Sequence, residues 1–275
     1  MELLVAKIGL GTAQFGQNYG ISNSRGRVPM EEVAEILEHA WEQGIDTLDT
    51  ASAYGNAQRV LGKIGVDKFQ IVSKYMPPKD MSIEGQLKET LEELQVERLY
   101  GFLAHQPSDL LDSPEQWNVL QHSKKKGYIE KIGFSLYDTG ELDSLLSFGL
   151  KPDLIQVPFN LIDNRFKEWM VTLKREGCEI HARSPFLQGL FFMKPDSLPS
   201  FFDELKPFLE SIQRYDNLPK LLLNYVAKKS FIDEVIVGFN SLHELKNSIS
   251  TQSTEDFNIE VPEIPKKILN PTFWP

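Results

Sequence analysis

Short apolar runs alternate along the chain with longer segments in which apolar residues recur every three or four positions. The run "FQIVSK" has the length of a buried strand, whereas Val33, Ile36 and Leu37 would share one face of a helix. This pattern predicts strands at Lys7–Gly11, Thr47–Asp49, Phe69–Lys74, Leu99–Leu103, Ile129–Ser135, Leu154–Val157, Glu179–Arg183 and Val235–Val237. It predicts helices from Pro29, around Ala57–Leu61, through Ile83 and Leu94, over Pro114–Lys126, through Leu142 and Leu146, around Phe166–Arg175, through Leu205 and Ile212, through Leu218 and Tyr225, and through Leu242 and Ile249.

Strand and helix patterns therefore alternate eight times, with short connections between them. Such a rhythm predicts an α/β fold in which the strands close into a (β/α)₈ TIM barrel. No linker rich in Pro, Gly or Ser divides the chain, so we expect a single domain over residues 1–275. The segment after Thr251 has four prolines and no clear period, which predicts a C-terminal tail over about residues 252–275 that packs over the barrel.

Composition narrows the function classes. The chain has a net charge of -10, which argues against nucleic acid as a partner because phosphates require a basic surface. No apolar stretch reaches the roughly 20 residues that span a bilayer, so we expect no membrane partner and a cytoplasmic protein. Cys178 is the only cysteine, and the histidines show no metal-ligand spacing, so no disulfide and no metal site is expected.

Four chemically capable side chains lie at or just past the ends of predicted strands. Asp49 closes the second strand, Lys74 the third, and His105 follows the fourth. Tyr54 comes five positions after Asp49, in "DTASAYG". Because the carboxyl ends of barrel strands meet on one face, an acid, a phenol, an amine and an imidazole would converge there. That set is suited to giving a proton to a carbonyl oxygen.

Several motifs, in order, resemble those of the aldo-keto reductases. They are "IGLGTAQFG", "DTLDTASAYG", "SKY", "FLAHQP", "GFS", "QVPFNLID" and "RSPFLQG", and the resemblance spans nearly the whole chain. It implies a (β/α)₈ fold and metal-free carbonyl reduction with a nicotinamide cofactor, usually NADPH. The family's catalytic tetrad corresponds to Asp49, Tyr54, Lys74 and His105.

Elementary chemistry gives each member of this tetrad a role. A phenol has an unperturbed pKa of about 10, and a cationic Lys74 nearby is expected to lower the pKa of Tyr54, the general acid. Asp49 would pair with Lys74 and hold it in place. His105 would donate a hydrogen bond to the substrate oxygen as charge develops there.

The resemblance also implies cofactor contacts. Ser135 and Gln156 match the residues that hold the nicotinamide carboxamide, although Leu136 replaces the Asn that usually follows the Ser. Arg183 replaces the aromatic residue that stacks on the ring; a guanidinium can stack too, but its charge suits an anionic substrate, a tuned cofactor or a salt bridge. The other implied cofactor residues are Gly11, Thr12, Ser184, Pro185, Phe186, Gln188, Gly238, Asn240, Glu244 and Ser248.

Cofactor preference stays open at this point. Family members that prefer NADPH commonly carry a Lys or Arg that meets the 2′-phosphate, and this chain has Glu244 at that place. A carboxylate repels phosphate but accepts a hydrogen bond from a ribose hydroxyl. The expected cofactor is therefore NADP(H) or NAD(H).

The sequence alone leaves other roles open for these four residues and for the barrel. The four residues could be structural, with Asp49 and Lys74 as a buried ion pair. Lys74 could form a Schiff base in a lyase or aldolase, or the barrel could be a non-catalytic nucleotide-binding regulator. The expected substrate is a small carbonyl compound, an aldehyde or ketone, with sugars and sugar derivatives among the options. The polar segment after the first strand contains Arg25 and Arg27, which could meet an anion or be solvated loop charges.

Overall fold

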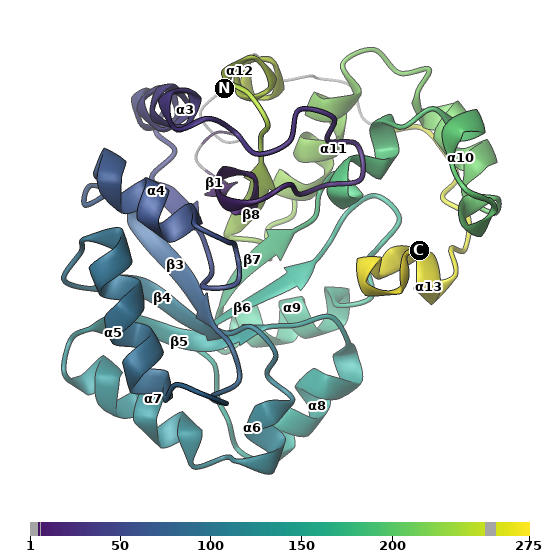
Figure 1. Ribbon diagram of the computed structural model, residues 1–275. Helices are drawn as coiled ribbons and strands as arrows, with labels where there is room; N and C mark the ends of the chain where they lie inside the picture. The colour runs from purple at the N-terminus through teal and green to yellow at the C-terminus, as the bar shows by residue number, and fades with distance from the viewer. Residues whose placement is uncertain (1–4, 6, 251–256) are drawn as a thin grey trace.

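Eight parallel strands form a closed barrel in the computed structural model, which describes residue 5, residues 7–250 and residues 257–275. Each strand pairs with its neighbour in the sequence, and β1 pairs with β8 to complete the ring (Figure 1). The strands are β1 (Ile8–Gly11), β2 (Thr47–Asp49), β3 (Gln70–Tyr75), β4 (Leu99–Ala104), β5 (Ile129–Ser135), β6 (Leu154–Pro158), β7 (Glu179–Arg183) and β8 (Glu234–Gly238). The fold is a single-domain (β/α)₈ barrel, as predicted.

The strands are buried on both faces, which is why they read as continuous apolar runs rather than alternating ones. Close packing leaves little room between some neighbours. A Cβ atom added to Gly133 in β5 would lie 1.7 Å from the carbonyl oxygen of Leu154 in β6. Glycine is therefore required at this position for β5 and β6 to approach one another.

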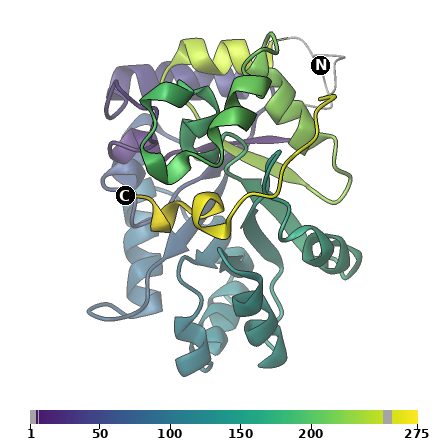
Figure 2. The same cartoon turned by 90° about the vertical axis from the view of Figure 1, so that its right-hand side faces the viewer.

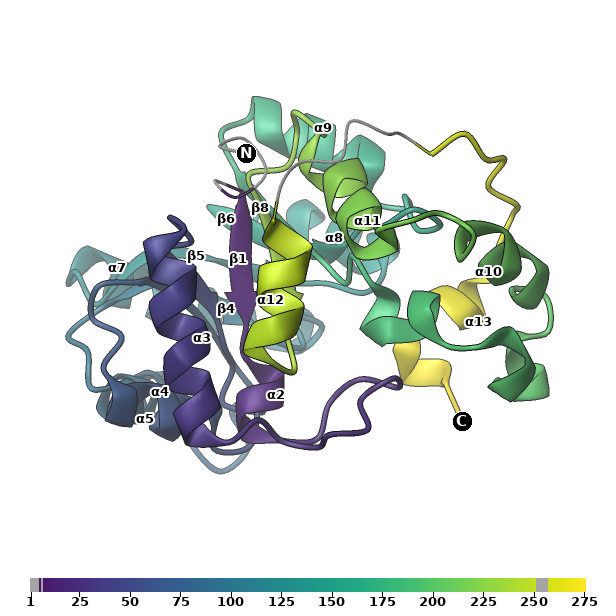
Figure 3. The ribbon, with the colours of Figure 1, turned by 90° about the horizontal axis from the view of Figure 1, so that it is seen from above.

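Helices surround the barrel and bury one stripe each against it, as α3 and α12 do beside β1 in Figure 3. The main helices are α3 (Met30–Glu42), α4 (Ala57–Ile64), α5 (Ile83–Leu94), α7 (Gln116–Lys125), α8 (Thr139–Ser147), α9 (Lys167–Arg175), α10 (Lys206–Ile212), α11 (Leu218–Ala227) and α12 (Leu242–Ile249). Short helical turns are α2 (Ala13–Gly16), α6 (Asp109–Asp112), α13 (Lys266–Leu269), η1 (Leu187–Phe192), η2 (Pro195–Ser197), η3 (Ser200–Phe202) and η4 (Pro271–Phe273).

A second apolar cluster lies outside the barrel core. It joins the loop after β6, the segment after β7 with α10, and the C-terminal segment through Ile264, Ile268 and Leu269. Figures 1 and 2 show the C-terminal segment beside α10, on the same side of the molecule. Arg165 anchors it by donating to the carbonyl oxygen of Leu269 at 2.9 Å. The predicted tail thus packs on loops here, while residues 251–256, where it begins, lie outside the described residues.

The observed elements differ from the predicted ones mainly at their ends. Most strands differ from the prediction by a residue at one or both ends. The helix predicted over Pro114–Lys126 is α7, and the short helix α6, which precedes it, was not predicted. Between β7 and α10 the chain forms the 3₁₀ turns η1–η3. Phe191 and Phe202 in these turns are fully buried in the second apolar cluster, whereas Phe192 lines a cavity described below.

Candidate active site

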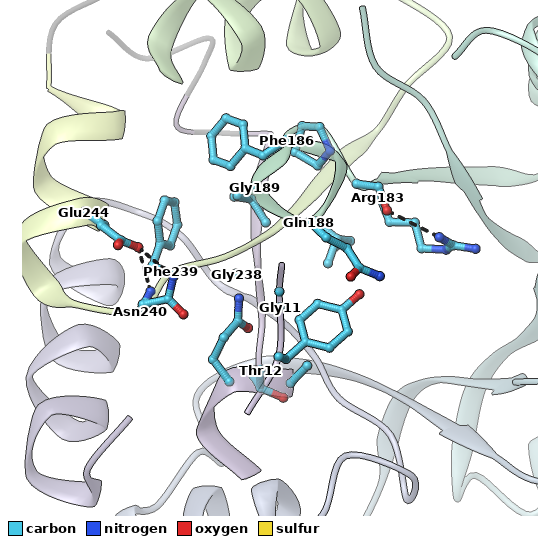
Figure 4. A pocket seen from close by; sticks show the side chains of 18 of the residues that line it. Gly11, Thr12, Arg183, Phe186, Gln188, Gly189, Gly238, Phe239, Asn240 and Glu244 are labelled. Carbon is cyan, nitrogen blue, oxygen red and sulfur yellow. Dashed lines mark hydrogen bonds between the residues drawn. The ribbon is translucent and has the colours of Figure 1, made fainter. Parts of the chain in front are cut away.

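A cavity of about 490 Å³ opens where the strands end at their carboxyl termini. Its wall comes from the ends of β1 and β8, the segment after β7, and the loop after β1 that includes Tyr19 and Ser22. Figure 4 shows Glu244 and Asn240 at one end of this cavity and Arg183 at the other. A volume of this size falls in the range typical of small-molecule and cofactor sites.

Asp49 and Lys74 form a buried ion pair across the neighbouring strands β2 and β3. The Nζ atom of Lys74 donates to both carboxylate oxygens of Asp49 at 2.7 Å and to the carbonyl oxygen of Thr50 at 3.0 Å. Both side chains are almost fully buried, so the pair satisfies charges that would be costly alone. Gln156 on β6 also donates to Asp49, at 2.7 Å, which links the far side of the barrel to the pair.

Tyr54 sits directly over this pair. Its hydroxyl group is 3.4 Å from the Nζ of Lys74, and its half-buried ring lies in the cavity wall. Two glycines allow the loop that carries it to approach α2. A Cβ atom on Gly16 would lie 1.8 Å from the carbonyl oxygen of Tyr54, and one on Gly55 would lie 2.5 Å from that of Gly16. The position of the phenol therefore depends on close backbone packing.

His105 completes the group just past the end of β4. Its ring meets that of Tyr54 edge-on with 5.8 Å between centroids. The Nδ1 atom is buried without a hydrogen-bond partner among the described residues. Burial and the Lys74 charge lower the pKa of His105 to about 3, so its imidazole is neutral near pH 7. A neutral imidazole keeps one N–H group that can donate to a substrate oxygen.

The pKa of Tyr54 does not follow the sequence-based expectation. Lys74 was expected to lower it, but burial, followed by the Asp49 charge, raises the pKa well above its ordinary value. The reason is that Asp49 balances the nearby ammonium, so the phenol experiences desolvation more than attraction to a cation. Burial likewise lowers the pKa of the Lys74 amine, while Asp49 opposes that shift. The phenol is thus held in its protonated form.

Most of the predicted cofactor residues share the cavity wall. They are Gly11, Thr12, Gln156, Arg183, Ser184, Pro185, Phe186, Gln188, Gly238, Asn240, Glu244 and Ser248, together with Asp49 and Tyr54 from the tetrad. Lys74 and His105 lie behind this wall, in contact with Tyr54. Ser135 is buried beside Gln156, its register partner on β6, and is not part of the wall.

Gln156 and Ser135 fit a carboxamide group. Since the Nε2 group of Gln156 is committed to Asp49, its Oε1 remains as an acceptor. Ser135, its register partner on β5, carries a hydroxyl that can both donate and accept. The amide oxygen of Gln156 can accept from the NH₂ group of a nicotinamide carboxamide, and the hydroxyl of Ser135 can donate to its carbonyl oxygen.

The opposite end of the cavity is built around the start of α12. The Glu244 carboxylate accepts from the backbone N–H of Asn240 at 2.8 Å, and Ser241 caps the helix by accepting from the backbone N–H of Glu244. Arg25 pairs with Glu32 and donates to the carbonyl oxygen of Asn240 at 3.0 Å. Arg27 donates to Asn56 at 3.2 Å.

Arg183 takes none of the ion-pair partners that the sequence allowed. Its guanidinium lies over the ring of Tyr137, with Cζ 3.9 Å from the centroid, and donates to the carbonyl oxygen of Leu136 at 2.9 Å. No carboxylate lies within 4.0 Å of it in the described part of the chain. The described residues therefore give the salt-bridge alternative no support.

Sequence reasoning missed several residues of the site. Gln14, Tyr19, Ser22 and Gly189 line the cavity, and Tyr137 supports Arg183. Tyr19 is sufficiently buried that desolvation, followed by the charge of Tyr54, raises its pKa above the ordinary range. These residues come from loops, where no periodic pattern indicates which side chains turn inward. The tyrosine in the polar segment after β1 was the one available signal.

Two further findings concern other classes of site. Among the described residues, no group of three or more His, Cys, Asp or Glu side chains is arranged to hold a metal ion. Within the same residues, no helix combines the length and apolar character needed to cross a bilayer.

A closed parallel barrel with a cavity at the carboxyl ends of its strands is the architecture of (β/α)₈-barrel enzymes. The chain belongs to the aldo/keto reductase family, whose family model matches residues 7–264. This is a family of oxidoreductases, so the protein is placed among enzymes of that class.

Individual relatives are distant. The chain is 21% identical over 281 residues to the uncharacterized oxidoreductase YqkF of Bacillus subtilis, an alignment that covers 90% of this chain and 87% of that protein. It is 28% identical over 169 residues to a glyoxal reductase of Bacillus subtilis, covering 58% of this chain and 59% of that protein. It is similar in fold to the aldo-keto reductase AKR11C1 from Bacillus halodurans, with a TM-score of 0.71, 21% identity and coverage of 90% and 88% of the two chains.

Proposed function

We propose that the protein reduces the carbonyl group of a small aldehyde or ketone with NADPH or NADH, and that Tyr54 is the proton donor. The observation that carries this proposal is the contact of the Tyr54 hydroxyl with Lys74, 3.4 Å away, at the wall of the cavity. The raised pKa keeps the phenol protonated, which is the state that a donor requires.

The chemistry divides between the cofactor and the chain. A bound nicotinamide supplies a hydride to the carbonyl carbon. The π electrons of the carbonyl bond then move onto its oxygen, which takes the hydroxyl proton of Tyr54. The phenolate left behind faces the Lys74 ammonium, and the neutral His105 donates to the same substrate oxygen while its charge develops. Asp49 holds Lys74 in position through both carboxylate oxygens.

The cavity wall supports a nicotinamide dinucleotide as the cofactor. Gln156 in the wall, with Ser135 buried beside it on β5, offers a carboxamide site near Asp49, and the start of α12 offers backbone donors at the other end. Glu244 stands where a 2′-phosphate would need a cation, which favours NADH over NADPH.

The alternative roles of Lys74 and of the barrel are less well supported. A Schiff base needs a free amine, but the Nζ of Lys74 is fully buried and donates to Asp49 and Thr50. Borohydride trapping of a carbonyl compound on Lys74 would favour the lyase. A purely regulatory barrel would not require the phenol, ammonium and imidazole to contact each other.

The proposal is tested with Tyr54→Phe. We expect turnover to fall by about 10²-fold or more, since general acid catalysis typically contributes that much. Consumption of NADH and NADPH would be measured with aldehydes, aldoses, keto-sugars, glyoxal and methylglyoxal, the last two because relatives are named as their reductases. Cofactor binding, followed by fluorescence titration, should change little.

Tyr75→Phe is the matched control. Tyr75 on β3 is also buried, and its hydroxyl has no hydrogen-bond partner among the described residues. It packs against Phe102 rather than the cavity, so this variant should turn over normally. Normal turnover by Tyr54→Phe as well would refute Tyr54 as the acid, and no turnover by the unmodified protein with any carbonyl or cofactor would refute the reductase.

A further inference from the structure

One positive charge in the cavity has no counterion in the described part of the chain. Arg183 ends β7, is half-buried and lines the cavity near Tyr54. Its protein contacts are neutral: the ring of Tyr137, the carbonyl oxygen of Leu136 and the hydroxyl of Ser184 at 3.4 Å. A guanidinium carries five N–H donors, and these two hydrogen bonds leave the others without a protein acceptor among the described residues.

The acids of the cavity cannot serve as that counterion. Asp49 is bound by Lys74 and by Gln156. Glu244 is held by Asn240 at the opposite end of the cavity from Arg183 (Figure 4). Lys74 is thus compensated, whereas Arg183 has no carboxylate partner within the described ranges and presents its charge to the cavity. Taking a charge out of water without a partner is costly, and a bound anion would remove that cost.

The guanidinium is also held in a fixed position. Stacking on Tyr137 and the hydrogen bond to Leu136 restrain its plane, so less conformational entropy is lost when a ligand binds. Its charge reaches the reacting groups. Burial and the Asp49 charge raise the pKa of Tyr54, and the Arg183 charge opposes that rise. Because Arg183 and Tyr54 line the same cavity, one molecule can place an anionic group on Arg183 and a carbonyl group at Tyr54.

We propose that Arg183 binds an anionic group of the substrate, so that the enzyme acts on carbonyl compounds that carry a carboxylate or a phosphate. The planar fork of Arg183 suits two-point contact with either oxyanion. This inference rests on the proposed reductase function and assigns Arg183 to substrate selection rather than to the nicotinamide.

Matched substrates test the proposal. The ratio of kcat/KM would be measured for 4-oxobutanoate against its methyl ester, and for glyceraldehyde 3-phosphate against glyceraldehyde. We expect at least one charged member to be preferred by about tenfold to a hundredfold, which corresponds to a charge-assisted hydrogen bond. The two pairs distinguish carboxylate from phosphate.

Arg183→Gln should abolish this preference mainly by raising KM for the charged member, with little change for the neutral one. Arg183→Lys keeps the positive charge but loses the planar guanidinium with its paired N–H donors. This variant should therefore retain part of the preference for the charged substrate. The Kd of the cofactor should stay unchanged in both variants. Arg59→Gln is the control, because it removes one surface arginine that pairs with Glu93 on α5, away from the cavity.

A binding measurement separates this inference from the proposed function. Malonate should raise the melting temperature of the unmodified protein but not of Arg183→Gln, and the uncharged malonamide should affect neither. An active reductase without preference for charged substrates would overturn the role of Arg183 alone. Weaker cofactor binding in Arg183→Gln, with an unaltered preference, would also overturn it and assign the charge to the cofactor.

Discussion

At the scale of single residues, the site is defined by which charges are paired. Lys74 is neutralised by Asp49, while Glu244 stands alone at the far end of the cavity with only neutral donors from Asn240. The same type of side chain thus has different consequences at the two ends. Asp49 is buried and positions a cation, whereas Glu244 is exposed at the start of α12.

Glu244→Gln should shift cofactor selection towards NADPH. The substitution removes one negative charge near the expected position of the 2′-phosphate, and the amide oxygen can still accept from Asn240. We expect Kd for NADPH to fall roughly threefold to tenfold while Kd for NADH changes little. Fluorescence titration of both cofactors measures this.

Glu89→Gln, an equally exposed acid on α5, controls for net charge. The idea fails if both variants change NADPH binding alike, or if Glu244→Gln changes neither cofactor.

At the scale of elements, α2 and the loop after β2 place the phenol. Gly16 ends α2, and Gly55, with φ of +59°, follows Tyr54 directly. Their backbones approach so closely that no side chain fits between them. The position of the Tyr54 phenol therefore depends on two residues that have no side chain of their own.

Gly16→Ala should displace Tyr54 and lower turnover. The new methyl group would lie 1.8 Å from the carbonyl oxygen of Tyr54, so α2 or the loop must move. We expect a loss of stability of about 1–3 kcal/mol, typical of overpacking, with a fall in kcat. Urea unfolding and steady-state kinetics measure the two effects.

Gly85→Ala is the comparison, because its Cβ would meet side chains alone, those of the exposed Met81 and of Ser82 just before α5, and no backbone atom. That variant should be neutral or slightly stabilised. Equal behaviour of the two variants would show that the contact with the Tyr54 loop is unimportant.

At the scale of the whole molecule, the two ends of the barrel differ in their roles. The carboxyl ends of the strands hold the cavity, while the amino ends hold a charged cluster around Glu179. Glu179 accepts from Tyr100 at 2.7 Å, is 2.6 Å from the Nε2 of the buried His181, and pairs with Lys131. In (β/α)₈ barrels, catalytic residues usually lie at the carboxyl ends of the strands, whereas residues at the amino ends contribute to stability.

Glu234 in this cluster should make stability depend on pH. Burial, followed by the charges of Asp46 and Glu179, raises its pKa from 4.5 to about 8. The folded state then holds a proton that the unfolded state has lost, so this contribution to stability is present below pH 4.5 and is lost as pH rises towards 8. Glu234→Gln should remove that loss, and the variant should gain about 1 kcal/mol or more over the unmodified protein at alkaline pH relative to acidic pH.

Urea unfolding at both extremes of pH measures this difference. Glu130→Gln on β5, an exposed acid near the same end, should leave the pH dependence unchanged. A parallel pH dependence for Glu234→Gln and the unmodified protein would contradict the proposed ionisation.

The barrel fold and the side chains at the ends of its strands were largely predictable from the sequence. Strands of this kind are distinct apolar runs, and several have a polar residue at the end. Asp49 and Lys74 are two such polar residues. What could not be predicted depends on depth and on loops. Burial reversed the direction expected for the Tyr54 pKa, and no local pattern showed that Tyr137 would support Arg183.

The cavity also lies across the seam where the chain's first and last strands meet. Gly11 on β1 pairs with Gly238 on β8, and both line the wall. A nascent polypeptide lacks this junction until β8 has been synthesised, so the binding site is among the last features to mature. A molecule bound in the cavity contacts both β1 and β8. Its binding free energy therefore adds to the free energy needed to separate these two strands.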